Sequence, residues 1–207
     1  MVEIQVTFIT SHGWEQYVLA DTEDTELDLR LYDQDINSVD LSPLRSFTNL
    51  RSLDMSGNKI WELNLRPLAS CKHLESLTLF GNQLQTINLF PLGSCKKLKD
   101  LWLFENLLSS VDLSPLGQCE SLSWLSLANN QLMNLDLSPL SNCKNLRFLA
   151  IENNKIPALD VTPLFDCPRL TEFSVDSEVG LHYSRTPSHL DDDHALYNLL
   201  QRSSALS

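Results

Sequence analysis

The chain is short of glycine, of basic residues and of long apolar runs, and each shortage excludes a class of function. Six glycines among 207 residues form no Gly-rich loop of the kind that cradles a nucleotide phosphate. Lys and Arg number 15 against 27 Asp and Glu, so the formal net charge of −12 disfavours nucleic acid and anionic membrane surfaces. No apolar stretch approaches the roughly 20 residues of a membrane-spanning helix. We therefore expect no nucleic-acid partner and no membrane partner.

Motifs of catalysis and metal binding are missing as well. The sequence has no HExxH segment, no Ser-His-Asp order of a catalytic triad and no CxxC pair among its five cysteines. From these motifs we expect no enzymatic activity, no cofactor and no metal.

The first residues, MVEIQVTFITSHG, lack the basic start and continuous apolar run of a secretory signal. No Asn-x-Ser/Thr acceptor for glycosylation occurs in the sequence. Hydrophobic residues make up 43% of the chain, which is enough for the core of one ordinary domain. We expect a soluble, cytoplasmic, single-domain protein.

The sequence repeats itself with a period of 24 residues. The proline register consists of Pro43, Pro67, Pro91, Pro115, Pro139 and Pro163. The cysteine register consists of Cys71, Cys95, Cys119, Cys143 and Cys167. The asparagine register consists of Asn58, Asn82, Asn106, Asn130 and Asn154. A unit this small cannot bury its apolar face alone, so neighbouring units must stack.

One unit, LSWLSLANNQLMNLDLSPLSNCKN at residues 122–145, contains LxxLxLxxNxL followed by LDLSPLxxC. This pattern resembles the leucine-rich repeat family, and the resemblance covers residues 26–175. It implies an α/β solenoid, a right-handed horseshoe with a parallel concave β-sheet and short helical turns on the convex side. It also implies that the array binds proteins or peptides along its concave face.

Local physical chemistry predicts the same fold. Leu125 and Leu127 alternate at period 2, as in a short strand with one buried face. Ser138 followed by Pro139 is a helix-start signal in which the serine caps the first free amides. Where each strand bends into the core, a stacked Asn amide can serve the buried backbone groups. The buried cysteines are expected to pack as small hydrophobes.

We expect one domain with a cap at each end. Residues 1–25 alternate apolar with polar positions around a Ser-His-Gly turn, which predicts a β-hairpin-like cap. Residues 26–178 hold six full repeats and one partial repeat. Residues 179–207 form a C-terminal capping segment, with a helix at about 188–202 that has an apolar face.

Two polar clusters leave cation binding open as an alternative. Asp112, Asp136 and Asp160 each precede a Ser-Pro or Thr-Pro turn, where capping is the common use of such residues. Three stacked carboxylates would repel one another unless amides or a calcium ion compensate. His189 and His194 enclose three aspartates but lie five positions apart, so they share a helix face poorly. Turn capping and helix-start electrostatics are the favoured interpretations.

Bulky aromatic residues stand where the strands should face water. They occupy outward positions on adjacent expected strands, with one further ring nearer the N-terminus: Phe80, Trp102, Phe104, Trp124, Phe148 and Tyr32. Acidic residues surround them: Asp100, Glu105, Glu152 and Glu172. If half of each of the five clustered rings is exposed, they present roughly 400–600 Å², the size of a functional patch. Small residues between the rings, among them Ser126 and Ala150, should leave hollows.

We predict from this pattern a module that binds a protein or peptide partner on an aromatic patch with an acidic rim. A monomer is favoured. A homodimer or homo-oligomeric scaffold is one alternative, and a regulatory subunit or effector of an enzyme such as a small GTPase is another. A third alternative is that the segment Val179–Arg185 folds back over the patch.

Overall fold

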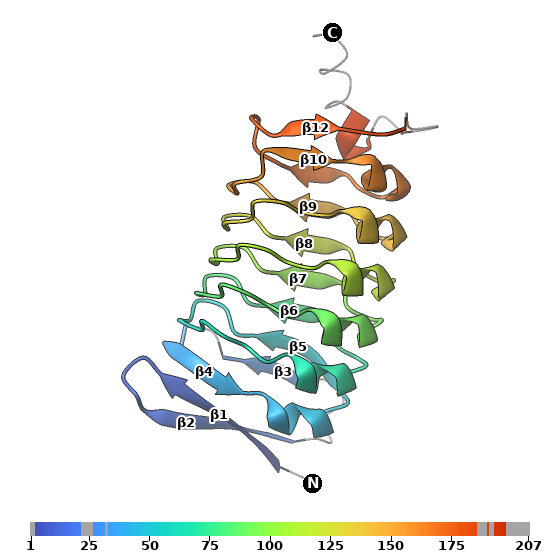
Figure 1. The fold of residues 1–207 in the computed structure, drawn as a ribbon. Helices are drawn as coiled ribbons and strands as arrows, with labels where there is room; N and C mark the ends of the chain where they lie inside the picture. The colour runs from blue at the N-terminus through green and yellow to red at the C-terminus, as the bar shows by residue number, and fades with distance from the viewer. Residues whose placement is uncertain (1–2, 22–26, 32, 186–189, 191–192, 198–207) are drawn as a thin grey trace.

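The computed structural model of the protein describes residues 3–21, 27–31, 33–185, 190 and 193–197, and its elements wind into a stack of similar coils (Figure 1). The strands are β1 (Glu3–Thr10), β2 (Glu15–Asp21), β3 (Leu27–Arg30), β4 (Ile36–Asp40), β5 (Leu50–Asp54), β6 (Ser76–Thr78), β7 (Asp100–Trp102), β8 (Trp124–Ser126), β9 (Phe148–Ala150), β10 (Ala158–Asp160), β11 (Glu172–Ser174) and β12 (Gly180–His182). The 3₁₀ helices are η1 (Ser42–Ser46), η2 (Arg66–Ser70), η3 (Phe90–Ser94), η4 (Ser114–Gln118), η5 (Ser138–Asn142) and η6 (Thr162–Asp166). Among the described residues, no helix combines the length and the apolar character needed to span a membrane.

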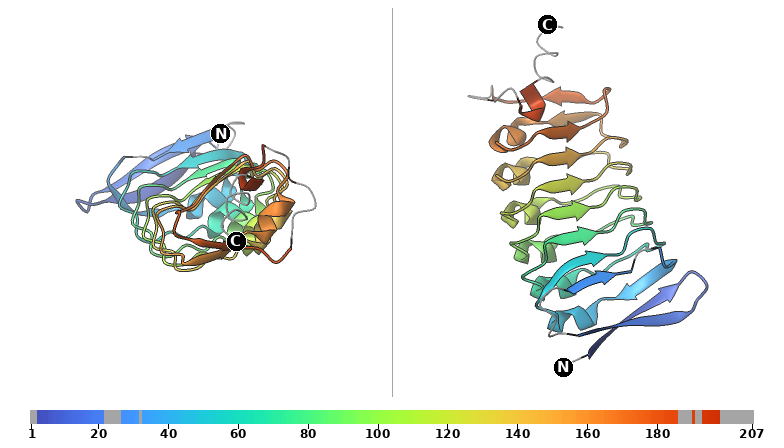
Figure 2. Two further views of the ribbon diagram at one scale, coloured as in Figure 1. Left: turned by 90° about the horizontal axis from the view of Figure 1, so that it is seen from above. Right: turned by 180° about the vertical axis from the view of Figure 1, so that it is seen from behind.

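A parallel sheet of seven strands runs along one side of the stack, in the order β11-β9-β8-β7-β6-β5-β3. Residues 24 apart lie beside each other on neighbouring strands, as Leu77, Leu101 and Leu125 do. The 3₁₀ helices form a second column away from this sheet (Figure 2). The expected solenoid with a parallel concave sheet and short helical turns is confirmed.

The asparagine register joins each coil to the one before it. The Asn106 side chain accepts a hydrogen bond from the Leu84 amide at 3.1 Å and donates to the Leu79 and Leu103 carbonyls at 3.0 and 3.2 Å. Asn130 repeats these contacts one coil further along. The predicted structural role is confirmed, because the amide satisfies buried backbone groups that no ladder partner reaches.

The helical turns begin with the predicted capping by the aspartates, whereas the predicted serine cap is wrong. Ser138 does not cap its own helix; instead Asp136 Oδ1 accepts the Ser138 amide at 2.8 Å. Asp112 and Asp160 accept the amides of Ser114 and Thr162 in the same way, at 2.8 and 2.9 Å. A carboxylate two residues upstream accepts the hydrogen bond of the first helical amide, so the serine side chain has no capping role there.

The N-terminal end of the array is closed by a hairpin. Strands β1 and β2 pair antiparallel, and β1 also pairs antiparallel with β4. The hairpin therefore extends the back of the first coil, and it does not lengthen the seven-stranded sheet. Val6 and Phe8 are buried in the core that it covers.

The C-terminal end is closed by side chains and a short strand. Strand β12 pairs with β10, and the Asp176 carboxylate accepts the Asn153 amide at 2.9 Å. His194 is buried, with Nε2 3.1 Å from the Cys167 carbonyl and Nδ1 accepting the Leu196 amide at 3.2 Å. Only residues 190 and 193–197 of the helix expected at 188–202 are described, and 195–197 are helical.

Candidate functional site

Five aromatic rings on the concave face contact one another in an unbroken series. We call these residues the aromatic ladder: Phe80, Trp102, Phe104, Trp124 and Phe148. The Phe80 and Phe104 rings stack with centroids 4.4 Å apart and planes 9° apart. Trp102 meets the Phe104 ring edge-on at 6.2 Å and the Phe148 ring at 6.0 Å. Trp124 stacks on Phe148 at 5.4 Å. The sequence-predicted cluster is thus brought together by strands β6 to β9 and the residues that follow them.

The rings are less exposed than the half-exposed patch anticipated from the sequence. All five are half-buried, and none belongs to the exposed large hydrophobic side chains of the described residues. Ser126 and Ala150 lie beside Trp102 on the next two strands, and they are only 4% and 2% exposed. The expected hollows are therefore absent at these positions, because the indole of Trp102 reaches across the small residues to Phe148.

The ladder has acids at both ends of one row. On the strands flanking Trp124 and Phe148, the neighbours in register are Asp100 and Glu172. Burial raises the pKa of Asp100, with Glu75 acting in the same direction and Lys99 opposing it. Glu172 is exposed. Asp100 is therefore a half-buried carboxylate held against the ladder, and Glu172 is a solvated one.

Two further predicted acids lie beyond the carboxyl ends of the strands. Glu105 is exposed and has φ of +54°, a left-handed slot that Gly57 and Gly81 fill in earlier coils. Glu152 is half-buried, and its Oε2 is buried without a hydrogen-bond partner among the described residues. The remaining predicted site residue, Tyr32, lies outside the described residues.

The segment Val179–Arg185 does not cover the ladder. Strand β12 pairs with β10, which belongs to a separate two-stranded sheet. Arg185 forms an ion pair with Asp166 of η6 at 2.6 Å, and the Ser184 amide donates to Thr162 Oγ1 at 2.8 Å. The suggestion that this segment folds back over the rings is therefore wrong, since its partners lie on the helical side of the coils.

The cysteine column is built for packing. Each thiol lies within hydrogen-bond reach of a carbonyl of the preceding coil, as Cys119 Sγ does at 3.3 Å from the Leu92 oxygen. All five cysteines are free and buried. Burial raises the pKa of Cys119 to about 12, with the neighbouring thiols of Cys95 and Cys143 adding to it. Thiols held in this protonated form are poor nucleophiles and poor metal ligands.

The polar clusters that left cation binding open have backbone partners. Hydrogen bonds from Ser114 lower the pKa of Asp112, and hydrogen bonds from Thr162 lower that of Asp160. Both ring nitrogens of His194 face backbone groups, and His189 lies outside the described residues. Within the described part of the chain, no three His, Cys, Asp or Glu side chains are arranged to hold a metal ion.

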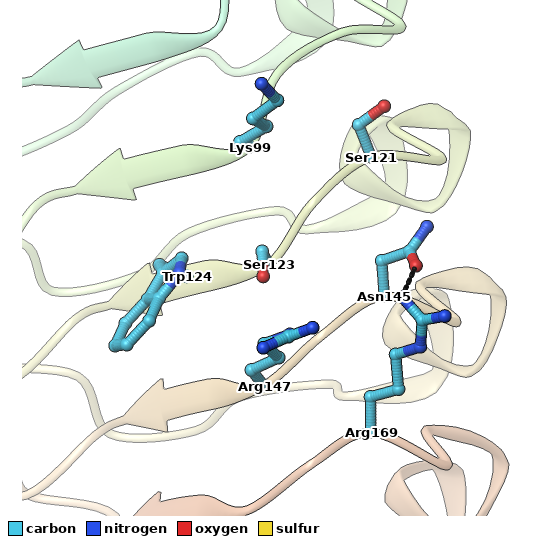
Figure 3. A pocket seen from close by; sticks show the side chains of 7 residues that line it. All are labelled: Lys99, Ser121, Ser123, Trp124, Asn145, Arg147 and Arg169. Atoms are coloured by element: carbon cyan, nitrogen blue, oxygen red, sulfur yellow. Dashed lines mark hydrogen bonds between the residues drawn. The ribbon is translucent and has the colours of Figure 1, made fainter.

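A pocket that sequence reasoning missed opens beside the ladder, where strands β7 to β9 begin (Figure 3). Its volume is about 280 Å³. Its lining residues are Lys99, Ser121, Ser123, Trp124, Asn145, Arg147 and Arg169. Three of them are cationic and none is acidic, which is unusual in a chain of net charge −12. The 24-residue register 51, 75, 99, 123, 147 contained the signal, because charge alternates along its first half.

Comparison with known proteins places the fold in a family. The Leucine Rich Repeat family matches residues 49–71. Three solved structures from Listeria monocytogenes are similar in fold. The functional domain of InlJ, described as including a cysteine ladder, is 26% identical over 75% of this chain, with a TM-score of 0.58. An internalin, inlF, is 25% identical over 73% of the chain with a TM-score of 0.56, and internalin C2 is 29% identical over 70% with a TM-score of 0.54.

The matches span only part of those proteins. This chain covers 30% of the InlJ chain, 43% of the inlF chain and 66% of the internalin C2 chain, less than two thirds of each. A search of curated proteins gives no match. The comparisons therefore establish the architecture and leave the partner to be argued from the surface.

Proposed function

Because this chain is a leucine-rich repeat protein, we propose that it binds a protein or peptide partner on its concave face, with the aromatic ladder at the centre of the contact. The observation that carries the proposal is the unbroken contact of five rings across four adjacent strands. Packing against one another keeps the rings half-buried yet leaves them on the sheet surface. A partner would meet a surface that is already ordered.

Pre-ordering matters because association costs the conformational freedom of the groups that make contact. The ladder residues sit on a hydrogen-bonded sheet, and each ring is held by another ring, so little freedom remains to be lost. Trp is enriched among the residues that dominate binding energy, and the ladder holds two. The half-buried rings favour a compact centre surrounded by polar contacts over a wide apolar interface.

Charge across the ladder is uneven, which gives the site a direction. Lys99 and Arg147 precede the strands, whereas Glu105 and Glu152 follow them. A partner segment that crosses the ladder along β9 would meet Arg147 first and Glu152 last. Electrostatic complementarity of this kind fixes orientation and register more than it raises affinity.

The test is capture of partners from a native lysate by the immobilised protein and by Trp102→Ala plus Phe104→Ala. We expect the double variant to lose a specific partner, with binding at least about tenfold weaker, because central aromatic residues carry most of the binding energy. The matched control is Trp61→Ala plus Phe90→Ala, which removes two rings that are 58% and 78% exposed outside the ladder. The control should retain the partner.

Equal capture by the two double variants would refute the aromatic ladder as the binding site. Urea unfolding of both variants checks that the loss is not a loss of folding. Light scattering over a dilution series addresses the homo-oligomeric alternative, since a protein that stays monomeric at micromolar concentration is not a scaffold of that kind. The cytoplasmic setting expected from the sequence stays a prediction.

A further inference from the structure

Arg51 in strand β5 and the residues directly before strands β6 to β9 form a single row across the sheet. The Glu75 amide donates to the Arg51 carbonyl at 2.7 Å, and the Lys99 amide donates to the Glu75 carbonyl at 2.8 Å. The Ser123 amide donates to Lys99 at 2.8 Å, and the Arg147 amide donates to Ser123 at 2.9 Å. These backbone bonds place the five side chains on consecutive strands, roughly 4.8 Å apart.

In the first half of this row, one carboxylate forms ion pairs with the cations on both sides of it. Glu75 lies between Arg51 and Lys99, and its Oε1 is 3.0 Å from Arg51 Nη1. Its other carboxylate oxygen accepts a hydrogen bond from the Lys99 ammonium. The Lys99 ammonium, assisted by the charges of Arg51 and Lys97, lowers the pKa of Glu75. One carboxylate thus joins two cations that are two strands apart.

The second half has the same arrangement of strands and flanking cations, but a serine replaces the central carboxylate. Ser123 lies between Lys99 and Arg147, as Figure 3 shows, with the same step of one strand on each side. The Arg147 side chain is exposed and forms no ion pair among the described residues. Ser123 itself is half-buried and contributes only a hydroxyl.

A second guanidinium is oriented toward the same pocket. Arg169 Nη1 donates to Asn145 Oδ1 at 2.8 Å, and Asn145 Nδ2 in turn donates to the Glu120 carbonyl at 2.9 Å. Asn145 therefore fixes the Arg169 fork with a side chain that is itself anchored to the backbone (Figure 3). A held guanidinium loses less freedom when it binds an anion, and its planar donors match a carboxylate.

We propose that the pocket beside Ser123 binds the carboxylate of an Asp or Glu side chain of the protein partner, in the place that Glu75 occupies between Arg51 and Lys99. This inference rests on the proposed function, because Trp124 lines both the pocket and the ladder. The partner segment thus carries an acidic residue next to the apolar residues that rest on the rings.

A carboxylate fits this surrounding better than a phosphate does. The row already bridges two cations with a single carboxylate at Glu75. Acids lie against the pocket lining, since Glu75 pairs with Lys99 and Asp100 is in register with Trp124. Repulsion from these acids grows with the charge of the ligand. A group bearing one negative charge suffers this repulsion least.

The test uses N-acetyl-glutamate amide as the probe, its glutamine counterpart as the neutral control and inorganic phosphate as the competing anion. Side-chain NMR signals of Arg147 Nε–H, Arg169 Nε–H and the Trp124 indole are followed during titration. We expect the glutamate probe to shift these signals in a saturable way at millimolar concentration, since single exposed charge pairs are weak. The glutamine probe should leave them unchanged.

Ser123→Glu supplies the carboxylate from within the chain. We expect it to shift the Arg147 signal before any probe is added and to weaken binding of the glutamate probe at least about tenfold. Ser110→Glu is the matched control, because it adds the same charge at an exposed position outside the pocket. Stronger binding of phosphate, or an unchanged response in Ser123→Glu, would overturn the proposal.

The two proposals fail separately. If Ser123→Glu still captures the native partner that Trp102→Ala plus Phe104→Ala has lost, the ladder is the binding site and the pocket is not part of it. If the ladder variant retains its partner, the proposed function fails whatever the titration shows. Urea unfolding of Ser123→Glu, which should be at least as stable as the wild type, excludes misfolding as the cause of either result.

Discussion

Along the buried columns the same residue type returns at every step of 24, whereas along the concave rows it changes from strand to strand. The column from Asn58 to Asn154 holds asparagine at all five of its positions, and each makes the same bonds to backbone groups. The row through Asp100, Trp124 and Phe148 holds an acid and then two aromatic residues. Both sets are spaced by one strand, so geometry alone does not separate them.

The difference lies in what each position must satisfy. A buried column faces the same unpaired amides and carbonyls in every coil, so the same residue type can form hydrogen bonds with them each time. A concave position faces solvent or a partner, and stacking imposes no single residue type on it. Changes in the columns should therefore cost folding stability, and changes on the concave face should mainly alter binding.

The largest expected effect is in the asparagine column. Asn106→Ala removes a donor to three carbonyls and an acceptor for the Leu84 amide, leaving buried backbone groups unpaired. We expect the free energy of unfolding in urea to fall by about 3–5 kcal/mol. Asn134→Ala, at an exposed position, should change it by less than about 0.5 kcal/mol.

A loss in Asn106→Ala as small as in the Asn134 control would break the contrast between column and surface. Asn154→Ala sharpens it, because Asn154 is only half-buried near the end of the array. Its loss of unfolding free energy should lie between those of Asn106→Ala and Asn134→Ala.

The cysteine column should give an intermediate effect. Cys119→Ala leaves a small cavity and removes the donor to the Leu92 carbonyl, so we expect a loss of about 1–2 kcal/mol in the free energy of unfolding. Cys119→Ser keeps a donor and should lose less. If Cys119→Ala is more stable than Cys119→Ser, the thiol–carbonyl contact does not contribute to the free energy of unfolding.

The same column predicts a dependence on pH. The folded pKa of Cys119 is raised to about 12 from an ordinary value of 9.0, so the unfolded chain loses its thiol proton first. The contribution of the thiols to stability is therefore complete below pH 9 and declines as the pH rises toward 12. Urea unfolding at pH 8 and pH 10.5 should show a smaller decline in Cys119→Ser than in the wild type.

The smallest expected effect has the opposite sign and lies on the concave face. Burial raises the pKa of Asp100, so its carboxylate form costs stability once the pH exceeds the ordinary value of 3.8. Asp100→Asn should increase the free energy of unfolding at pH 7 by less than about 1 kcal/mol. The gain should vanish well below pH 3.8, where the acid is protonated in both states.

Glu172→Gln is the matched control for Asp100, since Glu172 stands in the same row but is exposed. It should change stability by less than about 0.5 kcal/mol at either pH. Equal gains from the two substitutions would show that the net charge of −12 matters more than the burial of Asp100.

Sequence reasoning succeeded where the repeat imposed the same environment on every coil. It predicted the solenoid, the inward leucines and the role of the asparagine column, all of which depend on spacing. It failed at Ser138, since the identity of the group that reaches an amide depends on backbone direction within the turn. The exposure of the rings was also overestimated, because neither the lean of Trp102 over Ser126 nor its contact with Phe148 follows from register.

The residues Lys99, Arg147 and Arg169 were overlooked for a related reason. In the sequence they belong to three different repeats of an acidic chain. Stacking of the coils brings them to one pocket. The neighbouring acid, Glu75, is already paired with Arg51 and Lys99, so it does not neutralise Arg147 or Arg169. The missing carboxylate between Lys99 and Arg147 is recognised only by comparison with Glu75, which lies between Arg51 and Lys99.

By itself the sequence determined the period, the class of fold and the side of the sheet on which the aromatic residues stand, because alternation and a 24-residue repeat leave few ways to bury so many leucines. The tertiary structure alone decided how the rings pack, which acids are buried and where Lys99, Arg147 and Arg169 meet. These depend on side-chain direction and on contacts between coils, which are set by packing across the sheet rather than by order along the chain.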